Sequence, residues 1–237
     1  MTHGFTDIHH HLMYGMDDGP KSIEEAQVML RAAKADGIAK IIITPHVTPG
    51  VRYFDIDLFL ERFEGLRESA QQAEIKLLPG AEVFYTPMAR RMLGERRIPT
   101  MAGTEYVLVE FLPEIRFEDM FDAVENLLVG GYLPILAHTE RYQCLVSKPP
   151  RAFEMKKKLD VRYQVNCSTV VNSKGFFVDR FCKKLFADRL VDAVATDAHN
   201  SSTRPVLMTA AWKVLEERYG AGYAEQLMGI SGGLLFD

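Results

Sequence analysis

Short apolar runs rich in β-branched residues alternate along the chain with stretches of helical periodicity. Each run has the length of a buried strand. Seven such runs are present, at residues 5–8, 41–44, 75–78, 106–109, 134–137, 163–165 and 193–196. The pattern therefore predicts seven strands separated by helices.

The stretches between the runs carry signals for helix starts and ends. Residues 22–25 (SIEE) have the form of a capping box, and Gly37 is placed to end the helix that it opens. Thr86-Pro87 predicts an N-cap followed by a first-turn proline. Residues 57–72 and 117–129 have apolar positions at helical spacing, which predicts two longer helices.

A regular alternation of strand and helix implies parallel strand pairing, because parallel strands need crossover connections. Both an open doubly wound sheet and a closed (β/α) barrel satisfy this requirement. The sequence has no GxGxxG or Walker motif that would favour the open sheet. We therefore expect one α/β barrel domain over residues 1–237. Residues 48–55 (TPGVRYFD) form either a mobile loop over a pocket or an ordinary surface loop.

The composition restricts the kinds of partner. Of 237 residues, 47% are hydrophobic and 25% charged, and the net charge of -4 provides no basic field for nucleic acid or an anionic membrane. No segment reaches the roughly 20 apolar residues of a membrane helix, and the first residues lack a signal-peptide pattern. Cys144, Cys167 and Cys182 show no CxxC pairing, which fits a reducing compartment. We expect a cytoplasmic protein with no nucleic-acid partner and no membrane insertion.

Polar residues stand directly after the predicted strands. One residue per strand end gives a series at intervals of about 30 residues, the length of a βα unit: His9, His46, Glu82, Glu110, His138, Asn166 and Asp197. Because the carboxyl ends of all barrel strands open on one face, these side chains are expected to converge. Imidazoles and carboxylates without a thiolate suit Zn, Mn or Fe, and a carboxylate such as Glu82 could bridge two ions.

Two strand ends carry a pair of candidate ligands each. Strand alternation sends His9 and His11 to one side and His10 to the other. Asp197 and His199 form the second pair. Single residues have structural alternatives, such as a turn or cap role for His46. Glu110, at the end of an apolar strand, needs a cation partner, because burying an unpaired carboxylate is costly.

Two arginines follow candidate ligands on predicted rim loops. Arg141 comes three residues after His138, and Arg204 comes five residues after His199. A guanidinium matches phosphate oxygens by bidentate hydrogen bonding. We predict that both contact phosphate; the alternative is that each is a solvated surface arginine.

Several motifs together resemble a known family: DIHHHLMYGMDDGPKSIEEA, TPHV, PGAEVFYTP, ILAHTERY, YQVNCS and ATDAHN. They are similar to the PHP (polymerase and histidinol phosphatase) superfamily, and specifically to its bacterial CpsB/CapC-type tyrosine-protein phosphatases. The resemblance extends from Asp7 to about Leu227, and DxHxH followed by DDG is specific to this branch. Two departures are Met13-Tyr14 in place of Leu-Pro, and the C-terminal segment GISGGLLFD, which lacks the usual Asn-Pro motif.

The resemblance implies a distorted TIM-like (β/α)7 barrel, a single PHP phosphoesterase domain with two or three divalent metal ions. Manganese is the expected metal, with iron or zinc as alternatives. The implied partner is the phosphotyrosine-containing tail of the tyrosine autokinase, a polysaccharide co-polymerase, that controls capsule or exopolysaccharide export. The chain is then a cytoplasmic hydrolase of capsule biogenesis, and a homo-oligomer is left open.

The resemblance also assigns metal ligands and phosphate contacts. One ion takes His9, His11 and Asp197, and Glu82 bridges to a second ion held by Glu110 and His138. The third ion lies near Asp18, His46 and His199. Arg141 and Arg204 fall where the family places its phosphate-contacting arginines.

The expected reaction is attack of a metal-bridged hydroxide on phosphorus, since such a water has a pKa near neutrality. Four carboxylates against three divalent ions leave a core of about +2, which suits a phosphomonoester near -2. A tyrosine leaving group has a pKa of about 10 and needs no strong general acid.

Three other functions remain open at this point. A PHP-type histidinol-phosphate phosphatase shares the metal chemistry but acts on a small molecule. An amidohydrolase or TatD-like deoxyribonuclease also begins with HxH on a barrel strand. The chain could finally be a non-catalytic, metal-bound regulator of the kinase.

Overall fold

The apolar runs form parallel strands in the structure, a computed structural model that describes residues 4–229. Strands that are buried on both faces need nearly continuous apolar sequence, which Ile41-Ile42-Ile43 illustrates at 0% exposure. All seven expected strands are present. The strands are β1 (Phe5–His10), β2 (Ile38–Ile43), β3 (His46–Val47), β4 (Lys76–Pro79), β5 (Glu82–Phe84), β6 (Tyr106–Glu110), β7 (Leu133–Leu136), β8 (Arg162–Asn166) and β9 (Ala193–Ala195).

The strands form one ring, although their ladders fall into the orders β1-β2-β4 and β3-β5-β6-β7-β8-β9. Residues 44–45 separate β2 from β3, and residues 80–81 separate β4 from β5, so each pair is one bent stave of the barrel. β9 returns to β1, where the backbone N–H of His11 donates to the carbonyl of Ala198 at 2.9 Å and that of Asp197 to His9 at 2.8 Å. Seven staves close the ring, so the predicted (β/α)7 barrel is confirmed.

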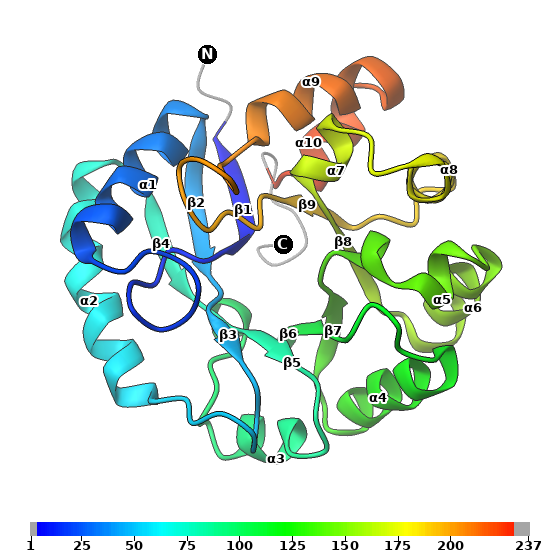
Figure 1. Ribbon diagram of the computed structural model, residues 1–237, viewed down its shortest axis with the longest axis horizontal. Helices are drawn as coiled ribbons and strands as arrows, with labels where there is room; N and C mark the ends of the chain where they lie inside the picture. Colours follow the sequence, from blue (N-terminus) through cyan, green and yellow to red (C-terminus); the bar gives the residue numbers. More distant parts are fainter. Residues whose placement is uncertain (1–3, 230–237) are drawn as a thin grey trace.

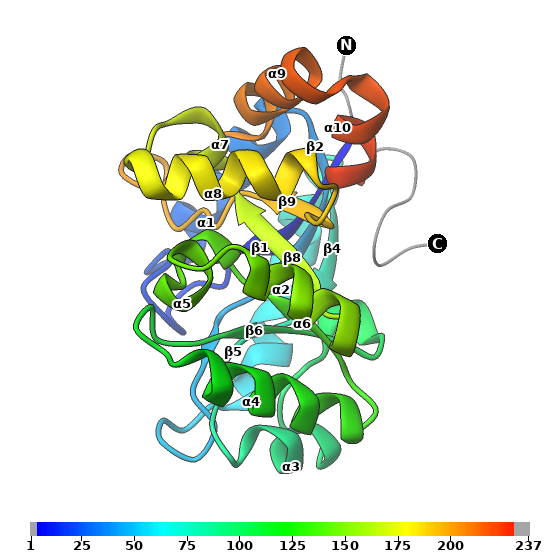
Figure 2. The ribbon, with the colours of Figure 1, turned by 90° about the vertical axis from the view of Figure 1, so that its right-hand side faces the viewer.

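Helices surround the strands (Figure 1). In the side view, α9 and α10 lie at one extreme of the molecule and α3 and α4 at the other (Figure 2). None of the helices within residues 4–229 has the length and apolar character needed to cross a bilayer. They are α1 (Ile23–Ala35), α2 (Ile56–Gln72), α3 (Ala89–Gly94), α4 (Phe117–Val129), α5 (Gln143–Val146), α6 (Pro150–Leu159), α7 (Cys167–Val171), α8 (Phe176–Ala187), α9 (Met208–Tyr219) and α10 (Ala221–Leu227), with 3₁₀ turns η1 (Met101–Gly103) and η2 (Thr139–Arg141).

The predicted helix boundaries hold in three of four places. α2 and α4 cover the expected segments, and α1 begins after Ser22, whose side chain accepts from the Glu25 N–H. The Glu25 carboxylate accepts from Lys21 rather than from Ser22, so the reciprocal half of the capping box is absent. The Thr86-Pro87 start was wrong, because the Thr86 hydroxyl forms a turn with the Met88 N–H and α3 begins only afterwards.

The barrel interior is apolar beneath the mouth that the carboxyl ends of the strands form. A small buried cluster, here called the plug, fills it: Ile8, Ile42, Met101, Leu108, Ile135, Ala137, Ala193 and Ala195. A larger apolar layer lies between the strands and the helices. Along β6, Leu108 belongs to the plug, and Glu110, two residues later, points toward the same interior at the open end.

One irregularity in β1 changes which side chains face inward. Asp7 pairs with Ile41 but His10 pairs with Ile43, so β1 has one residue more than β2 over this stretch. Such a bulge re-aims side chains. Because of it, the consecutive residues Ile8 and His9 both face the barrel interior, Ile8 in the plug and His9 at the mouth.

The two departures from the family pattern differ in what the structure shows. Met13 is fully buried, and the Arg62 guanidinium lies over the ring of Tyr14. The segment GISGGLLFD begins at Gly229 and otherwise lies outside the described residues.

Candidate metal centre

The candidate ligands meet at the mouth of the barrel, as the strand-end positions predicted. Side chains from β1, β3, β5, β6 and the turns after β7 and β9 approach one another there. Three groups each have ligand atoms within 4.8 Å of one another: His9, His11 and Glu82; His46, Glu82 and Glu110; and His11, Asp18, His46 and His199. His11, His46 and Glu82 each belong to two groups, so the groups are contiguous.

Glu82 is the centre of the cluster and is fully buried. Its Oε2 lies 3.2 Å from Nε2 of both His9 and His11, and 3.0 Å from Nδ1 of His46. Its Oε1 lies 2.8 Å from Nε2 of His138. A carboxylate approached by four imidazoles is well placed to bridge cations.

The tautomers of His9 and His11 follow from their outer partners. The Oε1 of Gln164 accepts from the His138 backbone N–H at 2.8 Å, so it is also an acceptor for His9 Nδ1 at 3.1 Å. Asp17 Oδ2 lies 2.8 Å from His11 Nδ1. Both Nδ1 atoms therefore carry protons, and in the neutral rings both Nε2 atoms present lone pairs.

Those two lone pairs point at one another. The Nε2 atoms of His9 and His11 are only 3.2 Å apart, with Glu82 Oε2 at the same distance from each. Within the described residues, Glu82 Oε2 and His199 Nε2 are buried without a hydrogen bond. Such a donor set is repulsive unless a cation is shared among its members, so these residues fit divalent metal ions with mixed N/O ligands.

The electrostatics of the cluster call for the same positive charge. Burial opposes protonation of His9, yet Glu82 and Asp197 outweigh it and raise its pKa to about 9. Burial likewise opposes charge on His46, but Glu110 and Glu82 raise its pKa to about 11. A metal ion supplies this charge while leaving the imidazoles neutral.

His199 differs because its surroundings already keep it neutral. Burial, with His11 and Arg204 nearby, lowers its pKa to about 3. Its Nε2 lies 3.1 Å from Asp18 Oδ1, and its ring stacks on that of His11 at 3.6 Å between centroids. Asp18 is 60% exposed, so this group lies on the solvent side of the cluster.

Arg141 and Arg204 both donate to Asp197. Arg141 reaches its Oδ2 at 2.7 Å and Arg204 its Oδ1 at 2.8 Å, and Arg204 also reaches Asp18 Oδ2 at 3.3 Å. Both arginine side chains remain partly exposed, at 43% and 36%. They therefore offer guanidinium N–H groups at the open side of the cluster. The sequence analysis predicts that these two groups contact phosphate.

Two strand ends have strained backbone where they deliver ligands. His138 follows β7 with φ +33°, and Asp197 follows β9 with φ +54°. The left-handed region is costly for a non-glycine residue and is found where function requires it. The strain turns both side chains toward the cluster.

Sequence reasoning missed the residues that orient the ligands. Asp17 accepts from His11 Nδ1, from the His46 N–H at 3.1 Å and from the Gly19 N–H at 2.9 Å. At Gly19 a Cβ would lie 2.4 Å from the His11 carbonyl, so the DDG glycine allows this loop to approach β1. The DDG motif is the sequence signal for this loop, and of its two acids the sequence analysis assigns only Asp18.

Gln164 is the second orienting residue that was missed. It holds His9, as described, and donates to Asn166 Oδ1 at 2.8 Å, and Asn166 donates to Asp197 at 2.8 Å. His10 is different: it is fully buried, and neither of its ring nitrogens has a hydrogen-bond partner among residues 4–229. It points away from the cluster, as alternation predicted.

The geometry leaves the individual ligand assignments as predictions. All nine predicted ligands lie in or beside the cluster. His46 is nearer to Glu82 and Glu110 than the three-ion assignment implied, and Asp197 is shared with two arginines.

Comparisons with known proteins agree with this picture. A family model described as capsular polysaccharide synthesis, CpsB/CapC, matches residues 5–233. The tyrosine-protein phosphatase CpsB of Streptococcus pneumoniae is 32% identical, with 93% of each chain covered. A similar crystal structure comes from work on YwqE of Bacillus subtilis and CpsB of Streptococcus pneumoniae, which are described as unique metal-dependent tyrosine phosphatases. It matches with a TM-score of 0.86 at 26% identity, and the alignment covers 98% of this chain and 97% of that chain.

A more distant structure shares the fold alone. Histidinol phosphate phosphatase from Lactococcus lactis, solved with zinc, L-histidinol and phosphate, has a TM-score of 0.60 at 12% identity. The alignment covers 93% of this chain and 94% of that chain. The comparison therefore supports the barrel and adds nothing about substrate.

Proposed function

Because the chain belongs to the CpsB/CapC family, we propose that it is a metal-dependent protein-tyrosine phosphatase built as one PHP phosphoesterase domain. The observation that carries the proposal is the convergence of His9 and His11 Nε2 on Glu82 Oε2, 3.2 Å from each, beside two partly exposed arginines. The relatives described as tyrosine phosphatases, and as metal-dependent, support the reaction class.

Nine residues are the proposed metal ligands: His9, His11, Asp18, His46, Glu82, Glu110, His138, Asp197 and His199. Manganese is the first choice of metal, and the same nitrogen and oxygen donors accept iron or zinc. Divalent ions bound there would supply Lewis-acid activation of a water and part of the charge that balances the phosphate. Asp17 and Gln164 hold the His11 and His9 rings with their Nε2 atoms toward the cluster.

Arg141 and Arg204 are the proposed phosphate-binding residues. Their present acceptor is the Asp197 carboxylate, whose pKa the surrounding charges keep below its usual range although burial opposes this. Each guanidinium donates to Asp197 from one nitrogen, and such N–H groups can equally donate to phosphate oxygens. They would hold the ester and balance the charge that grows on it during the reaction.

The proposed substrate is the phosphotyrosine-containing tail of a bacterial tyrosine kinase, a polysaccharide co-polymerase. The family's role in capsular polysaccharide synthesis supports this choice. The proposed location is the cytoplasm, and the three buried cysteines, none in a disulfide, are consistent with it.

The test combines metal analysis with a substrate panel. The purified protein would be analysed for its metals, then reconstituted with Mn, Fe or Zn and assayed on a phosphotyrosyl peptide, a phosphoseryl peptide and histidinol phosphate. We expect bound divalent metal and the highest kcat/KM on the phosphotyrosyl peptide. Preference for histidinol phosphate would assign a small-molecule phosphatase. Tight peptide binding without turnover at saturating metal would instead assign a non-catalytic regulator.

A further inference from the structure

A groove opens beside Arg141, next to the metal cluster. It encloses about 400 Å³, within the range of ligand sites, and Pro113, Val146 and Val178 give it apolar walls. The three come from the loop after β6, from α5 and from α8. Arg141 lines the groove and also donates to Asp197 at 2.7 Å, so the groove borders the proposed phosphate site through this residue.

Exposed apolar residues directly precede two of the groove's lining residues in the chain. Leu112, which precedes Pro113, is 60% exposed, and Phe176 and Phe177, which precede Val178, are 72% and 71% exposed. The two phenylalanine rings pack edge to face with centroids 5.5 Å apart. Exposed apolar side chains gathered beside a concave site are typical of protein-interaction surfaces.

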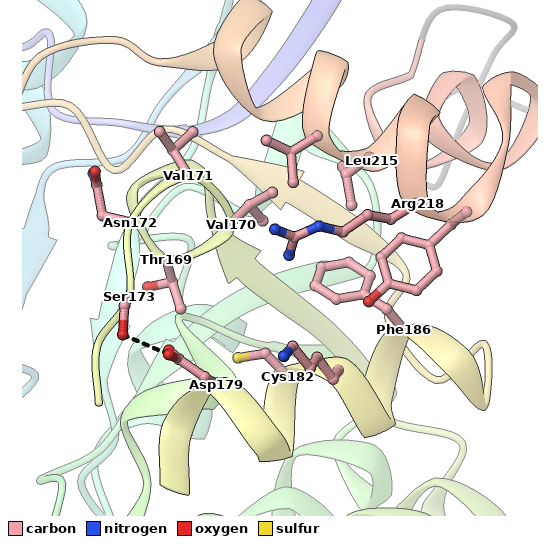
Figure 3. Close-up of a pocket in the computed structure, with 13 residues that line it drawn as sticks. Thr169, Val170, Val171, Asn172, Ser173, Asp179, Cys182, Phe186, Leu215 and Arg218 are labelled. Atoms are coloured by element: carbon pink, nitrogen blue, oxygen red, sulfur yellow. Dashed lines mark hydrogen bonds between the residues drawn. The ribbon is translucent and has the colours of Figure 1, made fainter. Parts of the chain in front are cut away.

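The groove also offers a cation on an ordered turn. Lys174 lines it, and the Lys174 backbone N–H donates to Asp179 Oδ1 at 2.9 Å. The Ser173 hydroxyl donates to the same carboxylate, as Figure 3 shows. The acid that lines the groove, Glu140, is buried, and its Oε1 accepts from the Asn166 N–H and the Thr169 hydroxyl, while its Oε2 has no hydrogen-bond partner among the described residues. An acidic group on a ligand is therefore favoured at Lys174.

The hollow on the other side of this segment is a weaker candidate. It encloses about 150 Å³ between α7, α8 and α9, with Arg218 directed into it (Figure 3). It shares Thr169 with the groove, but neither phosphate-binding arginine and none of the proposed metal ligands lines it. Of these two hollows in the described part of the chain, the groove beside Arg141 is the one that adjoins the proposed phosphate site.

We propose that this groove binds the peptide flanking the phosphotyrosine of the substrate. A bulky apolar side chain packs against Pro113, Val146 and Val178, and an acidic side chain pairs with Lys174. The proposal rests on the proposed tyrosine phosphatase function. It extends that function because it makes the enzyme selective for sequence around the phosphotyrosine rather than for the phosphoryl group alone.

The first experiment compares two substrates on one variant. Val178→Asp is assayed on a phosphotyrosyl peptide with leucine and glutamate beside the phosphotyrosine, and on p-nitrophenyl phosphate, which has no flanking residues to bind in the groove. We expect kcat/KM for the peptide to fall roughly tenfold or more, since one large apolar contact is lost, with p-nitrophenyl phosphate unchanged. Val129→Asp, at an exposed position on α4, is the matched control and should change neither substrate.

The second experiment reverses a charge at an exposed position, so folding is not at risk. Lys174→Glu should lower kcat/KM for the glutamate peptide and raise it for the same peptide with lysine in place of glutamate. Lys157→Glu, exposed on α6, is the control.

The outcomes separate the two proposals. A wild-type protein that hydrolyses neither substrate overturns the phosphatase function itself. Hydrolysis of both substrates with equal effects of Val178→Asp on each, or no charge-dependent reversal at Lys174, overturns the groove proposal alone. A change from dimer to monomer in Val178→Asp by analytical ultracentrifugation would show that a second copy of the chain occupies the groove, and would also overturn it.

Discussion

The plug and the mouth of the barrel are built by the same strands but bury opposite kinds of side chain. The plug contains apolar side chains at 5% exposure or less, and the mouth contains buried imidazoles and carboxylates with unsatisfied atoms. On β6 the change from Leu108 to Glu110 takes two residues. The comparison teaches that stability and chemistry are separated along each stave, as is general for barrels with sites at the carboxyl ends of the strands.

The sharpest test of this separation is Glu82→Gln at the mouth. Gln keeps the volume but loses the charge that four imidazoles surround, so the metal contribution to transition-state stabilisation, several kcal/mol, should be lost. That corresponds to a fall in kcat of about 10³-fold, measured on phosphotyrosyl peptide at saturating metal. The control Glu95→Gln, at an exposed position, should be fully active. Retained turnover in Glu82→Gln would remove Glu82 from the site.

Leu108→Ala tests the plug. Truncating a fully buried leucine costs about 3 kcal/mol of unfolding free energy, from lost burial and the cavity left behind. Chemical denaturation measures this loss, and the folded variant should keep its bound metal and its kcat. Leu60→Ala, on the half-exposed surface of α2, should change stability by less than about 0.5 kcal/mol. A large fall in kcat or in bound metal of folded Leu108→Ala, alongside its loss of unfolding free energy, would show that the two ends are not independent.

Arg204→Ala should separate phosphate binding from metal binding at the mouth. Loss of a charge-assisted hydrogen bond, about 2 kcal/mol, predicts a fall in kcat/KM of about 30-fold, with metal content retained. Elemental analysis and steady-state kinetics give the two readouts, with exposed Arg67→Ala as the control. Unchanged kinetics would exclude Arg204 from phosphate binding.

Asp17→Asn gives the smallest expected effect. The side chain orients His11 without touching substrate, and loss of such a partner weakens metal affinity by about tenfold. Competition with a chelator measures the affinity, and excess metal should restore kcat. Asp57→Asn, exposed at the start of α2, is the control. A kcat defect that metal cannot restore would give Asp17 a direct role instead.

The sequence predicted the staves because buried parallel strands must be nearly continuous apolar runs, and it predicted the site because strand ends of a barrel meet. It could not predict that two staves bend, at residues 44–45 and 80–81, since those bends depend on tertiary pairing. Asp17 was missed because its role depends on a loop folding back onto His11. The left-handed backbone at His138 and Asp197 is equally invisible in a pattern of polar and apolar residues.

The extra residue in β1 has a consequence for the three consecutive histidines. With it, His9 and His11 supply two imidazoles to the cluster while His10 packs away from it. Without the shift between Asp7 and His10, alternation from the inward-facing Ile8 would turn His10 inward and His9 and His11 outward, so one imidazole would replace two. The local register of this first strand therefore sets how many imidazoles it can direct into the cluster.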